Sequence, residues 1–101
     1  TRNSAHWAKG GGFDPKFCYL SGEAAAFLVT KGIKLVGIDS LGIEQFGSKD
    51  FAAHHALLRN GVTVLEGLYL ADVPPGDYTL FCGPLRIAGN EGAPARVFLV
   101  S

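Results

Sequence analysis

A helix-like segment that leads through a glycine into a short apolar strand most constrains this fold. Ser21 is placed to cap a helix that Gly32 ends. Three apolar residues fall between them at helical spacing: Ala24, Phe27 and Leu28. Residues 33–38 then form an apolar run typical of a buried strand, and Asp39 follows it. This order of elements predicts an α/β unit.

The rest of the chain extends this pattern. A second helix is predicted at residues 49–60, with Gly61 as its stop, and residues 62–70 are strand-like. Two more strands are predicted at residues 78–82 and 96–100. Residues 1–19 lack a clear period and contain a glycine triplet, which indicates a loop. We therefore expect an α/β fold with a mixed β-sheet and two main helices, in which residues 1–101 form a single domain or fragment.

Composition excludes several kinds of partner. The chain is 48% hydrophobic, and its nine basic and nine acidic residues give a formal charge of zero. This balance disfavours nucleic acid and anionic membranes as partners, and no apolar run is long enough to span a bilayer. Cys18 and Cys82 are far apart and are expected to be free thiols. No secretion signal is visible, which favours a cytoplasmic location, and the start at Thr1 suggests a longer or processed protein.

Glu66 is a carboxylate in an otherwise apolar strand. A regular pleat places it on the same face as Val62, Val64, Leu68 and Leu70. Burying an unpaired carboxylate costs several kcal/mol, so a cation, backbone donors or a metal must meet it. Alternatively, the strand bends at Gly67 and Glu66 reaches solvent.

The second predicted helix carries the pair His54-His55. At about 100° per residue, His54 projects into an apolar arc and His55 lies at its edge. The arc consists of Phe51, Leu57 and Leu58. A histidine in such a place is most often a hydrogen-bonded core residue, but an imidazole with a nearby carboxylate also suits Zn²⁺ or Mn²⁺. Two ligands are too few for a closed metal site.

Other polar residues have simpler explanations. Asp39 ends a strand, where α/β folds place functional groups, but an Asx turn is the favoured explanation. Arg86 and Arg96 are candidate substrate clamps, although single arginines are usually solvated. His6 and Trp7 are expected to pack rather than to form the lip of a site.

Residues 54–100 carry a specific resemblance. The segment HHALLRNG is followed by VLEGL, so that twelve positions separate His54 from Glu66. Further matches are Asp72-Val73-Pro74, Gly76-Asp77-Tyr78 and Pro84-Leu85-Arg86, and upstream TRNS, LSGEAA and GIDS. Together these segments resemble the C-terminal half of the cyclase and kynurenine formamidase (arylformamidase) family of metal-dependent hydrolases.

The resemblance implies half of a swivelling β/β/α domain and a divalent metal, Zn²⁺ or Mn²⁺. It implies that His54 and Glu66 are metal ligands, and that the reaction is hydrolysis of a small-molecule amide, such as the formamide of tryptophan catabolism. The family's other ligands come from an HxGTHxDxPxH-type motif in its N-terminal half, which this chain lacks. We therefore expect either a hydrolase that needs a missing N-terminal half, or a non-catalytic relative that acts as a homo-oligomeric ligand- or partner-binding module. A third interpretation is that His54 and Glu66 form a purely structural pair.

Overall fold

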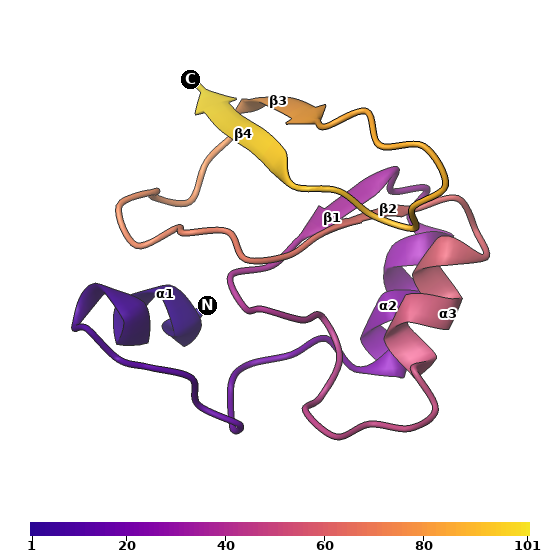
Figure 1. Ribbon diagram of the computed structural model, residues 1–101, viewed down its shortest axis with the longest axis horizontal. Coiled ribbons are helices and arrows are strands. Elements are labelled where there is room, and N and C mark those ends of the chain that lie inside the picture. The colour runs from indigo at the N-terminus through magenta and orange to yellow at the C-terminus, as the bar shows by residue number, and fades with distance from the viewer.

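The computed structural model describes all of residues 1–101, and Figure 1 shows how its helices and strands are arranged. In chain order the elements are α1 (Arg2–Ala8), α2 (Gly22–Thr30), β1 (Leu35–Gly37), α3 (Ala52–Leu58), β2 (Thr63–Leu65), β3 (Thr79–Pro84) and β4 (Ala95–Val100). Helices α2 and α3 lie side by side next to β1 and β2, whereas α1 stands apart near the N-terminus (Figure 1). The predicted α/β class is confirmed.

The first predicted helix is present as α2. The Ser21 hydroxyl accepts a hydrogen bond from the backbone N–H of Ala24 at 3.1 Å, so it caps the helix as expected. The second helix, α3, is shorter than predicted because Phe51, its N-cap, adopts a left-handed conformation with φ of 49°. A bulky residue rarely adopts this conformation, and it prevents the helix from extending toward Lys49.

The strands form two separate two-stranded sheets. β1 and β2 pair in parallel, with Val36 opposite Val64, whereas β3 and β4 are antiparallel, with Phe81 opposite Phe98. The expected mixture of parallel and antiparallel pairing is present, but the two kinds of pair are not joined into one sheet. The connection from β1 through α3 to β2 is the crossover that parallel strands require.

The strand predicted at residues 62–70 ends early, at Leu65. Gly67 has a φ of 71°, a left-handed conformation that breaks a strand and that glycine adopts without steric cost. The regular pleat expected through Leu70 was therefore wrong, and the alternative of a bend at Gly67 is confirmed. The bend leaves Glu66 directly after the end of β2.

Helix α1 was missed, and the loop predicted at residues 1–19 is wrong for Arg2–Ala8. The Thr1 hydroxyl accepts the backbone N–H of Asn3 and so caps the helix. The helix is further held by Asp39, which accepts the backbone N–H of Ser4 at 3.0 Å. The sequence of α1 shows no local apolar period. Its stability depends instead on Asp39, which is distant in the sequence.

The core lies between the α2–α3 pair and the parallel strands. It contains six buried apolar residues: Ala25, Ile38, Ile43, Ala53, Leu57 and Val62. The helices approach closely where Gly22 faces Ala52, because a Cβ atom on Gly22 would lie 2.8 Å from the Ala52 Cβ. This contact fixes the position of α3, and with it His54.

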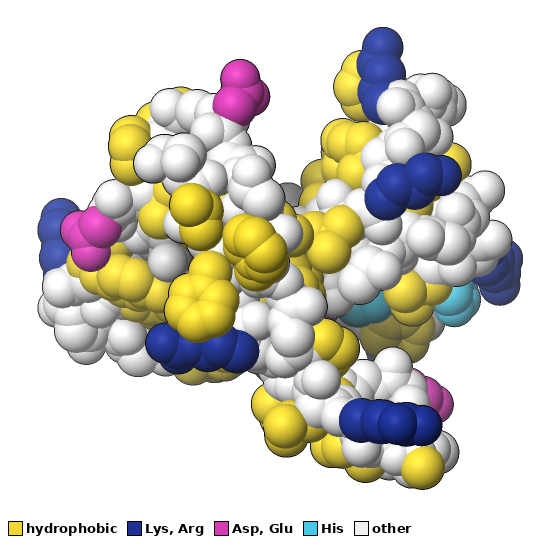
Figure 2. Space-filling view, turned by 90° about the horizontal axis from the view of Figure 1, so that it is seen from above, with side chains coloured by type: hydrophobic (Ala, Val, Ile, Leu, Met, Phe, Trp, Pro, Cys, Tyr) yellow, Lys and Arg dark blue, Asp and Glu magenta, His cyan; other side chains and the backbone are white.

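The β3–β4 sheet remains open to solvent on both faces. Its cross-strand pairs Leu80–Leu99 and Phe81–Phe98 point to opposite faces, and all four side chains are exposed. Figure 2, which views the molecule from this side, shows hydrophobic side chains spread over the surface with few, separated charges. An isolated two-stranded sheet is marginally stable in water, so this face is suited to packing against further protein.

Candidate metal centre

His54 and Glu66 meet across the junction between α3 and β2. The Nε2 atom of His54 lies 3.2 Å from Oε1 of Glu66. Both side chains are partly accessible, with 28% of His54 and 34% of Glu66 exposed. His54 therefore faces neither the closed core nor bulk solvent, whereas His55 is exposed. The structure brings together the two residues that the sequence selected.

Ile43 holds Glu66 in this position. Its backbone N–H donates to Oε1 of Glu66 at 2.8 Å, while its carbonyl accepts the N–H of Leu20 at 2.9 Å. The Ile43 side chain is fully buried in the core, so the donor cannot turn away. The Oε1 atom of Glu66 thus lies within reach of both a fixed backbone donor, the Ile43 N–H, and the His54 imidazole.

Glu44 is a functional candidate that the sequence analysis missed. Its Oε1 atom accepts the backbone N–H of His54 at 2.7 Å and lies 3.3 Å from the imidazole Nδ1. The Nδ1 contact lacks hydrogen-bond geometry, so this buried nitrogen has no hydrogen-bond partner. The segment from Leu41 to Ser48 has no helical or strand period, and no pattern could aim Glu44 at His54.

This arrangement fits two neighbouring ligands of one divalent ion. Two ligands about 2.0–2.2 Å from a tetrahedral Zn²⁺ lie about 3.4 Å apart, close to the observed separation of Nε2 and Oε1. Metal-binding histidines usually direct their other ring nitrogen at a carboxylate, and the Glu44 carboxylate lies 3.3 Å from Nδ1. This chain contains no group of three or more His, Cys, Asp or Glu side chains placed to hold one metal ion together. The residues present therefore fit part of a metal site.

Asp39 forms a separate, buried polar cluster. Its carboxylate accepts from the Thr1 amino group at 2.8 Å, the Thr1 hydroxyl at 2.7 Å and the Ser4 backbone N–H. Burial raises the pKa of Asp39, but these hydrogen bonds outweigh it and hold the pKa well below its ordinary value. The carboxylate does not form the Asx turn suggested by the sequence. It joins α1 to the end of β1.

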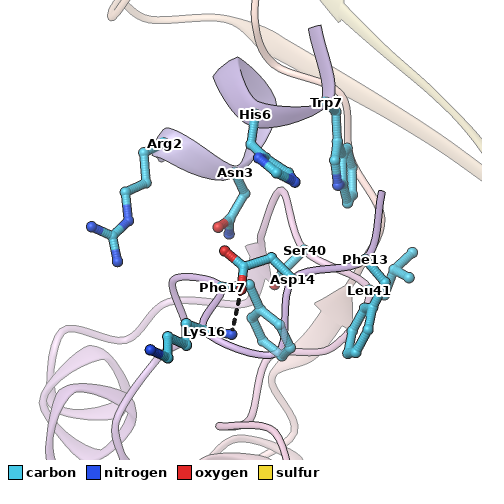
Figure 3. Close-up of a pocket in the computed structure, with 10 residues that line it drawn as sticks. All are labelled: Arg2, Asn3, His6, Trp7, Phe13, Asp14, Lys16, Phe17, Ser40 and Leu41. Carbon is cyan, nitrogen blue, oxygen red and sulfur yellow. Dashed lines mark hydrogen bonds between the residues drawn. The ribbon is translucent and has the colours of Figure 1, made fainter. Parts of the chain in front are cut away.

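Of the remaining candidates, only Arg96 lines the same hollow as His54 and Glu66. His6 and Trp7 line a pocket beside α1 (Figure 3), although the sequence favoured packing for both. Arg96 lies over the ring of Phe98, 5.0 Å from its centroid, on the exposed sheet. Arg86 is exposed in the loop after β3. Arg96 lines the same hollow as His54 and Glu66 and so remains a candidate to contact a substrate there, whereas Arg86 does not line this hollow.

Two expectations about the whole chain can be compared directly with the structure. Cys18 and Cys82 are both free thiols, as predicted. No helix has the combination of length and apolarity needed to cross a bilayer.

Comparison with known proteins agrees with the resemblance in the sequence. A kynurenine formamidase of Bacillus mycoides is 37% identical over 98 residues, which cover 97% of this chain and 46% of that protein. A solved structure described as a potential metal-dependent hydrolase with cyclase activity superposes with a TM-score of 0.89 at 40% identity. The chain is related to the cyclase and kynurenine formamidase family. No protein-family model matches it.

A second solved structure supports this relationship. It is described as a predicted metal-dependent hydrolase from Bacillus stearothermophilus, and it superposes with a TM-score of 0.88 at 40% identity. The matches cover 98% of this chain but only 47% and 46% of the two solved chains. The chain therefore spans about half the length of the relatives it matches, and it has the fold of the corresponding part of a cyclase-like hydrolase.

Proposed function

We propose that this chain supplies His54 and Glu66 as two ligands to the divalent metal of an enzyme that hydrolyses a carbon–nitrogen bond in a small-molecule amide. The 3.2 Å approach of His54 Nε2 to Glu66 Oε1 is the observation that carries the proposal. The relatives described as metal-dependent hydrolases and as a kynurenine formamidase support it. In this proposal the chain corresponds to the C-terminal half of the family's domain.

Each residue of the cluster has a defined task in this proposal. The imidazole Nε2 of His54 and the carboxylate of Glu66 hold the ion, which is Zn²⁺ or Mn²⁺. Glu44 positions His54 by accepting the backbone N–H of that residue, and the same carboxylate oxygen faces the imidazole Nδ1 atom. Ile43 orients the carboxylate through its backbone N–H. When bound, the metal supplies the Lewis acidity that lowers the pKa of water and polarises the amide carbonyl.

The remaining ligands and the acid–base group must then come from other protein. The relatives are about twice as long as this chain, and their remaining half is the natural source. The exposed apolar side chains of β3 and β4 offer a surface on which that half can pack. The proposed substrate class is an aryl formamide or related amide.

Reconstitution tests this function. A polypeptide matching the remaining half of the relatives is mixed with the chain, and turnover of aryl formamides is measured with Zn²⁺ or Mn²⁺ added. We expect turnover only when metal and both polypeptides are present, and we expect the Glu66→Gln variant to abolish it. A stable complex that hydrolyses no formamide would contradict the proposal.

The alternative function is that of a non-catalytic module that self-associates. The exposed pairs Leu80–Leu99 and Phe81–Phe98 favour it, since an identical copy is also able to cover them. Sedimentation equilibrium separates the alternatives. A chain that is monomeric at all concentrations would exclude the self-associating module.

A further inference from the structure

The hollow that contains the His54–Glu66 pair separates β2 from the β3–β4 sheet. Its volume is about 1380 Å³, which exceeds the roughly 300–1,000 Å³ of small-molecule sites. Residues 61–70 line one side, and β4 with one face of β3 lines the other. Figure 1 shows β3 and β4 above β1 and β2. A space of this size suits a segment of polypeptide better than a metabolite.

The edge of β2 that faces the hollow has no hydrogen-bonding partner. A parallel strand bonds each neighbour through alternate residues, and β2 bonds the segment that contains β1 through Thr63 and Leu65. Val64 lies between them, so its N–H and carbonyl point away from β1, and neither has a backbone partner in the chain. No residue of β1 lines the hollow. The hollow therefore runs along the open edge of β2.

The outer edge of β4 is open as well. The Leu85 N–H donates to the Pro94 carbonyl at 3.0 Å, and this bond fixes which cross-strand pairs of the β3–β4 sheet are hydrogen-bonded. Because such pairs alternate along antiparallel strands, the backbone groups of Ala95, Val97 and Leu99 point away from β3. These three residues present a row of unpaired donors and acceptors.

The hollow extends around this edge of β4 and not around the edge of β3. Arg96 and Phe98 line it, although their side chains lie on the opposite face of the sheet from that of Val97. Their cross-strand partners, Gly83 and Phe81, do not line it. A strand placed in the hollow would therefore meet the unpaired backbone of β4.

Pro84 distinguishes the edge of β3 from the edge of β4. It pairs with Ala95 at a position whose backbone points outward, and proline has no N–H to offer there. Proline on an edge strand is a common device against further pairing. No proline occurs in β4, so Val97 and Leu99 keep their donors.

The composition of the hollow selects an apolar occupant. Glu66, Glu91 and Arg96 are the only charged residues that line it, and Glu66 already accepts the N–H of Ile43. The rest of the lining is mostly apolar, so a segment that placed charges here would lose their hydration without gaining partners. Two open strand edges favour an extended segment that forms main-chain hydrogen bonds.

We propose that the remaining half of the family domain inserts extended apolar strands into this hollow, where they pair with the outer edges of β4 and β2. The inference rests on the proposed function, which takes that half as the partner. The chain spans 47% and 46% of the two solved relatives, so a partner of similar length is available to supply the strands. Since His54 and Glu66 line the same hollow, strand pairing would bring the partner beside the proposed metal ligands.

Amide hydrogen exchange measured by NMR tests this pairing. The sample is the chain in complex with a polypeptide matching the remaining half of the relatives, without metal or substrate. We expect the amides of Val64, Val97 and Leu99 to exchange about a hundredfold more slowly in the complex than in the free chain, because each gains a hydrogen bond. The Cys82 amide, on the outer edge of β3, should exchange rapidly in both.

Val97→Pro and Cys82→Pro form a matched pair of variants. The two residues lie opposite each other in the β3–β4 sheet, and neither N–H has a partner in the chain. Val97→Pro removes a donor from the proposed interface and should weaken the complex about tenfold, whereas Cys82→Pro should leave its affinity unchanged. Circular dichroism establishes that each variant is folded, and the exchange measurement on the parent needs no variant.

The possible outcomes separate this inference from the proposed function. A complex in which the amides at either edge exchange as fast as in the free chain overturns the inference and leaves the proposed function intact. A complex with protected edges that hydrolyses no formamide contradicts the proposed function alone. The inference is also overturned if no complex forms. Protection that appears in the chain alone as its concentration rises would overturn it too, because the occupant would then be a second copy.

Discussion

The Nε2 atom of His54 lies 3.2 Å from Oε1 of Glu66, although twelve positions separate the two residues in the sequence. The helix α3 ends at Leu58, the chain turns at Gly61 with a φ of 70°, and β2 returns beside the helix. The bend at Gly67 then leaves Glu66 at the end of the strand, facing His54. This turn brings an imidazole and a carboxylate together, and the backbone N–H of Ile43 holds the carboxylate in place.

Glu44 is expected to position His54 rather than to bind the ion. Glu44→Gln removes the charge that faces Nδ1 but retains an oxygen able to accept the backbone N–H of His54. We expect metal affinity of the reconstituted site to fall about tenfold, as for other partners of histidine ligands. Calorimetric titration with Zn²⁺ measures this, and ¹⁵N shifts of the His54 ring report its tautomer.

Glu23→Gln is the matched control for Glu44→Gln, because Glu23 is an exposed carboxylate in the first turn of α2. It should alter neither the affinity nor the ring shifts. If Glu44→Gln also leaves both unchanged, Glu44 has no positioning role. If it abolishes binding as completely as Glu66→Gln does, Glu44 is itself a ligand.

Asp39→Asn should lower the free energy of unfolding by about 1–3 kcal/mol, the cost of weakening a buried charged hydrogen-bond cluster. The pKa of Asp39 is lowered in the folded chain, so its stabilising effect is complete above the ordinary aspartate pKa of about 3.9 and declines as pH falls below it. The variant should therefore lose less stability than the parent on acidification from pH 5. Urea unfolding at several pH values measures both effects.

The exposed Asp77 provides the control for this pH series. Asp77→Asn should change neither the midpoint in urea nor the dependence on pH. An Asp39→Asn variant with the stability and acid sensitivity of the parent would show that the Thr1 and Ser4 contacts do not stabilise the fold.

Gly67→Ala isolates the conformational requirement of the bend after Glu66. A Cβ atom at this position meets no atom within 4 Å, so the cost comes from the positive φ alone and should be about 1–2 kcal/mol. Gly92→Ala is the control, because Gly92 has the same open surroundings without a positive φ. Thermal unfolding compares the two, and equal melting temperatures would argue against strain at Gly67.

Elements with strong local signals could be predicted from the sequence. The Ser21 cap and the apolar spacing before Gly32 predicted α2, and the strands predicted at residues 78–82 and 96–100 correspond to β3 and β4. Helix α1 could not be found in this way, because its stability depends on Asp39, which follows it by more than thirty positions. The early end of β2 was expected only as an alternative, since the apolar pattern continues past Gly67 while the strand ends before it.

The candidate site also contains residues that the sequence predicts and residues that it does not. His54 and Glu66 stand out because each is a polar residue within an apolar pattern, and the family resemblance selects the same pair. Glu44 and Ile43 lie in a segment without periodicity, and their roles depend on tertiary contacts to His54, Glu66 and Leu20. The supporting residues of a site are therefore harder to predict than the residues they support.

The open β3–β4 sheet leads to a prediction about association. A polypeptide matching the remaining half of the relatives should bind the chain and raise its melting temperature, because it covers the exposed Phe81 and Phe98. Phe98→Ser should weaken this complex, whereas Leu41→Ser, which changes an exposed apolar residue elsewhere, should not. Sedimentation velocity measures the complex. Unaltered binding by Phe98→Ser would place the interface on another surface.

Calorimetric titration of Zn²⁺ and Mn²⁺ into the chain and into its complex with the remaining half is the measurement to make first, using the parent and the Glu66→Gln variant. We predict weak binding to the chain alone, tight binding to the complex, and loss of tight binding in Glu66→Gln, because His54 and Glu66 are two ligands of a shared site. Metal binding that is equally tight in the parent and variant complexes, or absent from both, would show that the His54–Glu66 pair is only a structural contact.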